Sequence, residues 1–117
     1  MMTDRKQSLQ GLLEKVEENV NSMGHEWIEG FGHDNFAYAS QAFSGSIDAF
    51  VALLNAVLPG WWWQVSATWN GKAHVALYPP NPPNPAGTGK ASGSNPDPAR
   101  AGLIAILKAL IAKEGDA

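Results

Sequence analysis

Hydrophobic residues recur at helical spacing in the first half of the chain. In residues 3–23 the apolar positions lie three or four apart and form one stripe, with charged and amide side chains between them. Residues 46–58 repeat this spacing, and Ser46 stands where an N-cap belongs. Pro59 and Gly60 then stop the pattern. Both segments are predicted to be helices with one buried face.

A third helix is predicted over residues 98–113. Asp97 is a capping residue, and Pro98 suits the first helical turn, where a backbone N–H has no partner in the helix. The apolar stripe is strong, and Ile104 and Ile106 widen it beyond one face. This helix is therefore expected either to lie at the centre of the molecule or to be shared with a second chain.

Apolar and polar residues alternate over residues 61–78, around an Asn-Gly turn signal, and this pattern predicts a β-hairpin. A two-residue loop would put the apolar residues of the two strands on opposite faces. A three-residue loop over 69–71, with Gly71 in the left-handed conformation, pairs Val65 with Val75 and puts both on one face. That apolar face consists of Trp61, Trp63, Val65, Ala67, Ala73, Val75 and Leu77.

The other face of the hairpin is the candidate contact surface. It carries Trp62, Gln64, Ser66, Thr68, Lys72, His74, Ala76 and Tyr78. Trp62 lies opposite Tyr78 on this register, and aromatic rings beside polar groups are typical of protein-contact surfaces. The predicted contact patch is Trp62, Gln64, Lys72, His74 and Tyr78. The alternative is that a loop or a helix covers Trp62.

Periodicity does not decide the structure of residues 25–45, because glycines interrupt an aromatic-rich stretch. Residues 36–39 could form a short strand and residues 26–31 a helical turn. A two-stranded hairpin also leaves two open edges that need a cap. Either residues 36–39 supply a third strand or a second copy of the chain does, so a homodimer is one arrangement that the sequence favours.

Residues 79–98 hold seven of the eight prolines and are predicted to form an extended loop, since proline disrupts both sheets and helices. Residues 80–85 have the proline spacing of a polyproline ligand, but no basic anchor is close, so a solvated loop is the better interpretation. Residues 87–91 superficially resemble a phosphate-binding loop. However, Asn84 and Ala91 replace the glycine and the hydroxyl that such a loop requires.

Length, composition and charge fit one soluble domain. The chain has 117 residues, 44% hydrophobic and 16% charged, without an apolar run long enough to span a membrane. A net charge of -3 indicates no positively charged surface for non-specific binding of nucleic acid. The lack of cysteine excludes disulfides and thiolate chemistry. No signal peptide is visible, so a cytoplasmic location is expected. We expect an α+β domain over residues 1–117, with three helices packed on a small antiparallel hairpin sheet and an extended or disordered loop over 79–97.

The titratable residues form no recognised catalytic or metal-binding motif. His25, Glu26, His33, Asp34 and His74 offer nitrogen and oxygen ligands, but their spacing matches no known metal site. No nucleophile-elbow sequence occurs either. We therefore expect no catalytic residue, no cofactor and no metal ion, and interpret the chain as a protein without enzymatic activity.

Four segments resemble the phage ABA sandwich domain family, and together they span nearly the whole chain. They are Leu12-Leu13-Glu14-Lys15-Val16-Glu17, Ser46-Ile47-Asp48-Ala49, Leu58-Pro59-Gly60-Trp61-Trp62-Trp63 and Ala99-Arg100-Ala101-Gly102-Leu103-Ile104-Ala105. The run of three tryptophans after Leu-Pro-Gly is the most specific of them. The chain departs from the family in residues 18–44 and in the long proline-rich insertion after Tyr78.

The small proteins of that family are encoded by bacteriophages and prophages and have no established activity. The resemblance therefore implies an origin and an architecture, with no catalytic residues to carry over. Together with the contact patch, it leads to the hypothesis of a phage- or prophage-encoded accessory protein that binds a protein partner and modulates a host or anti-phage factor. The alternative hypothesis is a minor component of the virion or of its assembly.

Overall fold

The computed structural model describes residues 2–20, 24–68, 70–79 and 91–116. Within these residues the chain forms five helices and one three-stranded antiparallel sheet. The elements in order are α1 (Met2–Glu17), α2 (Gly24–Phe31), α3 (Phe36–Phe43), α4 (Ile47–Val57), β1 (Trp62–Ala67), β2 (Ala73–Tyr78), β3 (Ala91–Asn95) and α5 (Pro98–Asp116). The predicted α+β class is confirmed, but the prediction of three helices and a two-stranded hairpin is not matched.

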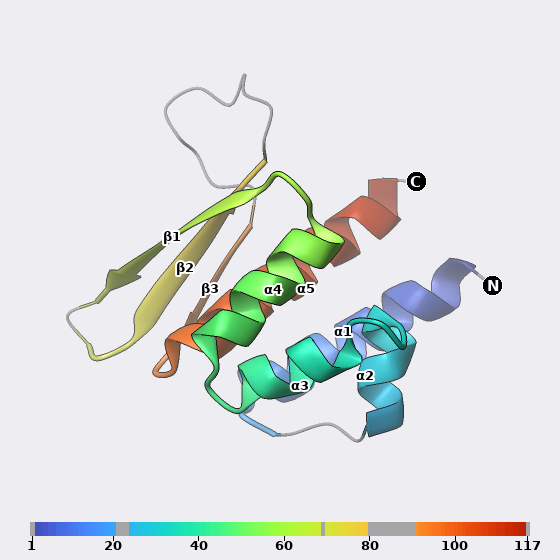
Figure 1. Ribbon diagram of the computed structural model, residues 1–117, viewed down its shortest axis with the longest axis horizontal. Coiled ribbons are helices and arrows are strands. Elements are labelled where there is room, and N and C mark those ends of the chain that lie inside the picture. The colour runs from blue at the N-terminus through green and yellow to red at the C-terminus, as the bar shows by residue number, and fades with distance from the viewer. Residues whose placement is uncertain (1, 21–23, 69, 80–90, 117) are drawn as a thin grey trace.

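Helix α5 lies at the centre of the fold. As predicted, Asp97 caps it: its Oδ1 accepts hydrogen bonds from the backbone N–H groups of Ala99 at 2.8 Å and Arg100 at 3.3 Å. One side of α5 packs against β2 and β3, and other sides contact α1, α3 and α4 (Figure 1). Every residue from 101 to 107 is buried. The broad apolar surface of this helix is therefore used within the chain.

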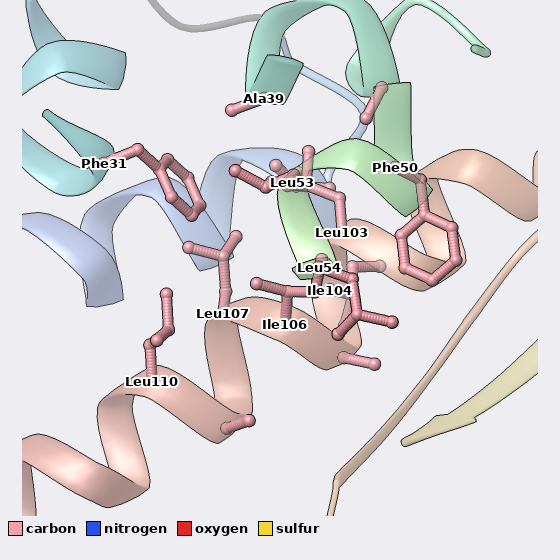
Figure 2. Packing of buried hydrophobic residues seen from close by; sticks show 14 of the residues in the cluster. Phe31, Ala39, Phe50, Leu53, Leu54, Leu103, Ile104, Ile106, Leu107 and Leu110 are labelled. Atoms are coloured by element: carbon pink, nitrogen blue, oxygen red, sulfur yellow. The ribbon is translucent and has the colours of Figure 1, made fainter. Parts of the chain in front are cut away.

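The hydrophobic core joins α5 to the helices that surround it. Figure 2 shows Phe31 of α2, Ala39 of α3, Leu53 of α4 and Leu107 of α5 converging in this core. The ring of Phe50 lies directly against Gly102, where a Cβ atom would collide with it. Close packing of this kind requires a glycine at that point of α5.

The hairpin has the register that the alternation predicts. Val65 lies opposite Val75, and the Thr68 N–H donates a hydrogen bond to the Lys72 carbonyl at 2.8 Å. Gly71 has a φ of 83°, the left-handed conformation that the three-residue loop needs. Trp69, the first residue of that loop, lies outside the described residues.

A third strand forms where the sequence analysis predicts a loop. β3 pairs antiparallel with β2, so the expectation of an extended loop over 79–97 is wrong for Ala91–Asn95. Residues 80–90, which include the polyproline spacing and most of the phosphate-loop-like segment, lie outside the described residues. β3 is possible because no proline occurs between Pro85 and Pro96. β3 therefore covers the edge of β2 that the hairpin would leave open, so no second chain is needed at that edge.

The segment before Ser46 differs from its predictions in two places. α1 ends at Glu17 rather than near residue 23, and Asn19 beyond it adopts a left-handed φ of 60°. Residues 36–39 belong to α3, so the predicted strand there is wrong, whereas the predicted helical turn at 26–31 lies in α2. α3 buries Ala39, Ala42 and Phe43, and this spacing is that of a helix face.

Helix α4 begins and ends as predicted. Ser46 is its N-cap, and its hydroxyl accepts a hydrogen bond from the Ala49 N–H at 3.0 Å. The helix ends before Pro59, and Gly60 turns the chain into β1 with a φ of 86°. None of the helices in the described ranges combines the length and the apolar character needed to cross a bilayer.

Candidate protein-contact surface

Helix α5 covers one face of the sheet, and none of the described helices covers the other. The residues at alternate positions that point away from α5 form what we call the open face: Trp62, Gln64, Ser66, His74, Ala76, Tyr78, Ser92 and Ser94. Within the described part of the chain, the helices lie on the opposite side of the sheet (Figure 1). All the members of the open face are exposed or half-buried.

The aromatic end of the open face is built by a cross-strand pair. Trp62 and Tyr78 are direct partners in the β1–β2 register, and their rings stack with centroids 4.1 Å apart and planes 15° from parallel. The Tyr78 hydroxyl donates a hydrogen bond to Oε1 of Gln64 at 3.3 Å. Trp62 is nevertheless 51% exposed. The structure therefore brings three of the five predicted patch residues together around one exposed indole.

The other two predicted residues lie farther along the hairpin. His74 is on the central strand, where its Nδ1 lies 3.0 Å from the Ser94 hydroxyl of β3. Lys72 is exposed beside the hairpin loop, and six positions separate it from Tyr78, which is about 20 Å along a strand. Lys72 therefore stands at the far end of the same surface rather than beside the aromatic pair.

Ser92 and Ser94 belong to this surface, although sequence reasoning missed them. Their register positions beside Ala76 and His74 put both hydroxyls on the open face. The sequence of β3, Ala-Ser-Gly-Ser-Asn, contains no residue type that favours strands, so pattern alone does not reveal it. The available signal is the proline-free interval of residues 86–95 within an otherwise proline-rich stretch.

The predicted apolar residues of the covered face are buried to different degrees. Val75 and Leu77 of β2 are fully buried beneath α5. Trp63 is half-buried, and its ring meets Phe50 of α4 edge to face, with centroids 5.1 Å apart. Val65 lies on the same face but is 44% exposed. The helices thus cover the central strand completely and β1 only at its first residues.

A pocket lies between α1 and α2, away from the sheet. It is an open pocket of about 770 Å³ lined by Arg5, Gln7, Ser8, Gly11, Leu12, Glu26 and Glu29. Two of its charged groups, those of Arg5 and Glu26, hold the two helices together. Glu26 forms an ion pair with Lys15 at 2.5 Å, and Nε of Arg5 donates to the Gly30 carbonyl at 3.4 Å. We therefore interpret this pocket as a feature of the helix packing.

The structure does not bring the candidate metal ligands together. His25 and His33 are exposed on and after α2, and His74 lies on the sheet. Among the residues that the structure describes, no three His, Asp or Glu side chains are close enough to hold a metal ion. Comparison with known proteins adds no further site, because no family model, no curated protein and no solved structure matches this chain.

Proposed function

We propose that this protein is a non-enzymatic, phage- or prophage-encoded accessory protein that works by binding a protein partner through the open face of its sheet. The observation that carries the proposal is Trp62, an indole that is 51% exposed yet held in place by its stack on Tyr78. A large aromatic side chain with few rotatable bonds loses little entropy on binding and offers much contact area. The phage context rests on the family resemblance of the tryptophan-rich segment.

The surroundings of Trp62 fit a protein partner better than a charged ligand. The strands of the open face carry amide, hydroxyl and imidazole groups beside the aromatic pair, and the exposed Lys72 stands about 20 Å away. Depletion of charge around aromatic anchors is typical of the centre of a protein interface. We place this activity in the cytoplasm of the bacterial host, with a host or anti-phage factor as the partner class.

Replacement of Trp62 by alanine tests the proposal. We expect the Trp62→Ala variant to fold, with a loss below about 1 kcal/mol in the free energy of unfolding, because it gives up one cross-strand aromatic pair at a side chain that is 51% exposed. Affinity capture from the host should retain a reproducible protein on the native chain and lose it on the variant. Gln41→Ala, at an exposed position of α3, is the matched control and should retain it.

Two results would contradict this function. A large loss of stability in Trp62→Ala would identify Trp62 as a structural residue. Capture of the same protein by the native chain and by Trp62→Ala would move the interface elsewhere. Presence of the protein in purified phage particles, with no host partner captured, would instead favour a role in the virion or its assembly.

A further inference from the structure

The outer edge of β1 lacks the usual protection of an edge strand. β1 is the end strand of the sheet, and among the described residues no other strand pairs with its outer side. Its sequence, Trp-Trp-Gln-Val-Ser-Ala, contains neither a charged residue nor proline. Natural edge strands normally carry such residues because they prevent pairing with another chain. β1 is therefore open to a further strand.

The backbone groups available at this edge follow from the hairpin register. Thr68 donates its N–H to Lys72, so their pair is a hydrogen-bonded one. Pairs alternate along an antiparallel ladder, which turns the N–H and C=O groups of Trp63, Val65 and Ala67 away from β2. These three residues present three donors and three acceptors on one line, which we call the free edge.

The side chains at the free edge show that it is incompletely covered. Val65 is 44% exposed, whereas Val75, its direct partner on the same face of the sheet, is fully buried. Ala67 is exposed as well. The layer of helices therefore ends between β2 and the far half of β1. Within the described part of the chain, Val65 and Ala67 therefore form an apolar strip on the inner face that the helices leave exposed.

We propose that a second copy of this chain adds its own β1 antiparallel to this edge, about a twofold axis at Val65. In this register Val65 lies opposite the partner's Val65, and Trp63 lies opposite the partner's Ala67. All three outward-facing residues of each strand then form hydrogen bonds. The two sheets become one six-stranded sheet, with both sets of helices on the same side.

The free edge fits a copy of itself in shape and in charge. Trp63 and Ala67 lie two positions to either side of Val65, so each Trp63 indole faces the methyl group of the partner's Ala67. Each chain has a net charge of -3, but the paired strands are neutral, so no like charges meet along the strands. A twofold interface needs such self-complementarity. Because the strands span only about 20 Å, we expect a small interface and dissociation in the micromolar range.

Cysteine cross-linking tests this register directly, because the native chain contains no cysteine. Opposed residues in a hydrogen-bonded pair have Cα atoms about 5.5 Å apart, within disulfide range. Val65→Cys should therefore form a disulfide-linked dimer under mild oxidation. Ala67→Cys is the matched control, since the two copies of residue 67 would be more than about 13 Å apart. We expect cross-linking of Val65→Cys to be at least about tenfold faster.

Sedimentation velocity of the full chain over a range of concentrations gives the second measurement. The native protein and Gln41→Lys should shift toward twice the mass of one chain as concentration rises. Val65→Lys, which places two cations opposite each other, should remain a monomer.

A native protein that stays monomeric at millimolar concentration, or equal cross-linking of the two cysteine variants, would overturn the proposal. Stable binding of an unrelated extended peptide at β1 without self-association would assign this edge to another protein. The edge and the open face are separate surfaces, so either proposal can fail alone.

Discussion

Gly93 shows how one missing side chain determines the distance between the sheet and the central helix. It lies on the covered face of β3, and a Cβ atom there would stand 2.5 Å from the Ala101 carbonyl oxygen and 2.7 Å from Ile104. Real Cβ atoms do not approach backbone oxygens so closely, and neither the helix backbone nor a β-branched side chain can move aside easily. The glycine therefore allows α5 to lie directly on β3.

Gly93→Ala is expected to lower the free energy of unfolding by about 2–3 kcal/mol, through overpacking between β3 and α5. Urea denaturation followed by tryptophan fluorescence measures the change. Gly11→Ala is the matched control, because Gly11 is exposed in α1 and nothing lies within 4 Å of an added Cβ. That control should gain about 0.5–1 kcal/mol from helix propensity. Equal stability of the two variants would show that β3 does not press on α5.

Among the elements, α5 depends on its first turn most clearly. Its first turn is partly buried, with Ala99 fully enclosed, so its free N–H groups cannot rely on water alone. Asp97 provides the acceptor for two of them, and its own backbone N–H is held by Oδ1 of Asn95 at 2.9 Å. The side chains of Asn95 and Asp97 therefore hold the short connection between β3 and α5 by hydrogen bonds at both of its ends.

Asp97→Ala should cost about 1 kcal/mol of stability, since the N-cap acceptor is removed while the backbone can stay in place. Asp97→Asn keeps an acceptor oxygen at the same position and should lie close to the native protein. Thermal unfolding of the three proteins in parallel measures the difference. If the asparagine variant is as unstable as the alanine variant, the charge of Asp97 rather than its hydrogen bonds stabilises the helix.

Elements with their own local signals were predictable from the sequence. α4 and α5 carry capping residues and strong apolar spacing, and the face pattern of the hairpin selects one loop length. The start of α3 was predicted as a strand because Phe36 and Tyr38 are strand-favouring residues. The residues of α3 that face the core include two small alanines, Ala39 and Ala42, which give a weak helical pattern. β3 has no strand propensity of its own. Its structure comes from pairing with β2 and from the packing of α5 against Gly93.

The candidate contact patch was predictable to the extent that the hairpin register was. Because alternation places Trp62 opposite Tyr78, their adjacency follows from the sequence, and the rings are indeed stacked. The contribution of β3 to the open face could not be derived, since no short-range pattern relates Ser94 to His74, twenty positions away. Long-range pairing of weakly patterned strands is decided by tertiary structure.

At the level of the complete fold, Arg100 ties together segments that are distant in sequence. Its Nε donates to the Phe43 carbonyl at 2.5 Å, its guanidinium lies 4.1 Å from the centre of the Phe43 ring, and Nη1 donates to Oδ1 of Asn19 at 3.2 Å. The same oxygen of Asn19 accepts from the buried Asn95 at 2.9 Å. The ends of α1, α3 and β3 therefore meet at the first turn of α5.

Arg100→Lys should reduce stability by about 1–2 kcal/mol, because an ammonium group cannot stack as a plane and donate in two directions at once. Lys108→Gln is the control, since it removes an exposed pair with Glu17 at 3.9 Å that also links α5 to α1. That control should change stability by less than about 0.5 kcal/mol. Chemical denaturation measures both variants, and a smaller loss for Arg100→Lys than for Lys108→Gln would contradict this role.

The central position of α5 also has a consequence for biosynthesis. Translation delivers α1 to β3 before α5, the helix on which the sheet and three of the other helices pack, so the nascent polypeptide carries apolar faces with no counterpart. Ribosome-bound chains that end before residue 98 are thus candidates for chaperone capture, and productive collapse waits until α5 has emerged from the exit tunnel.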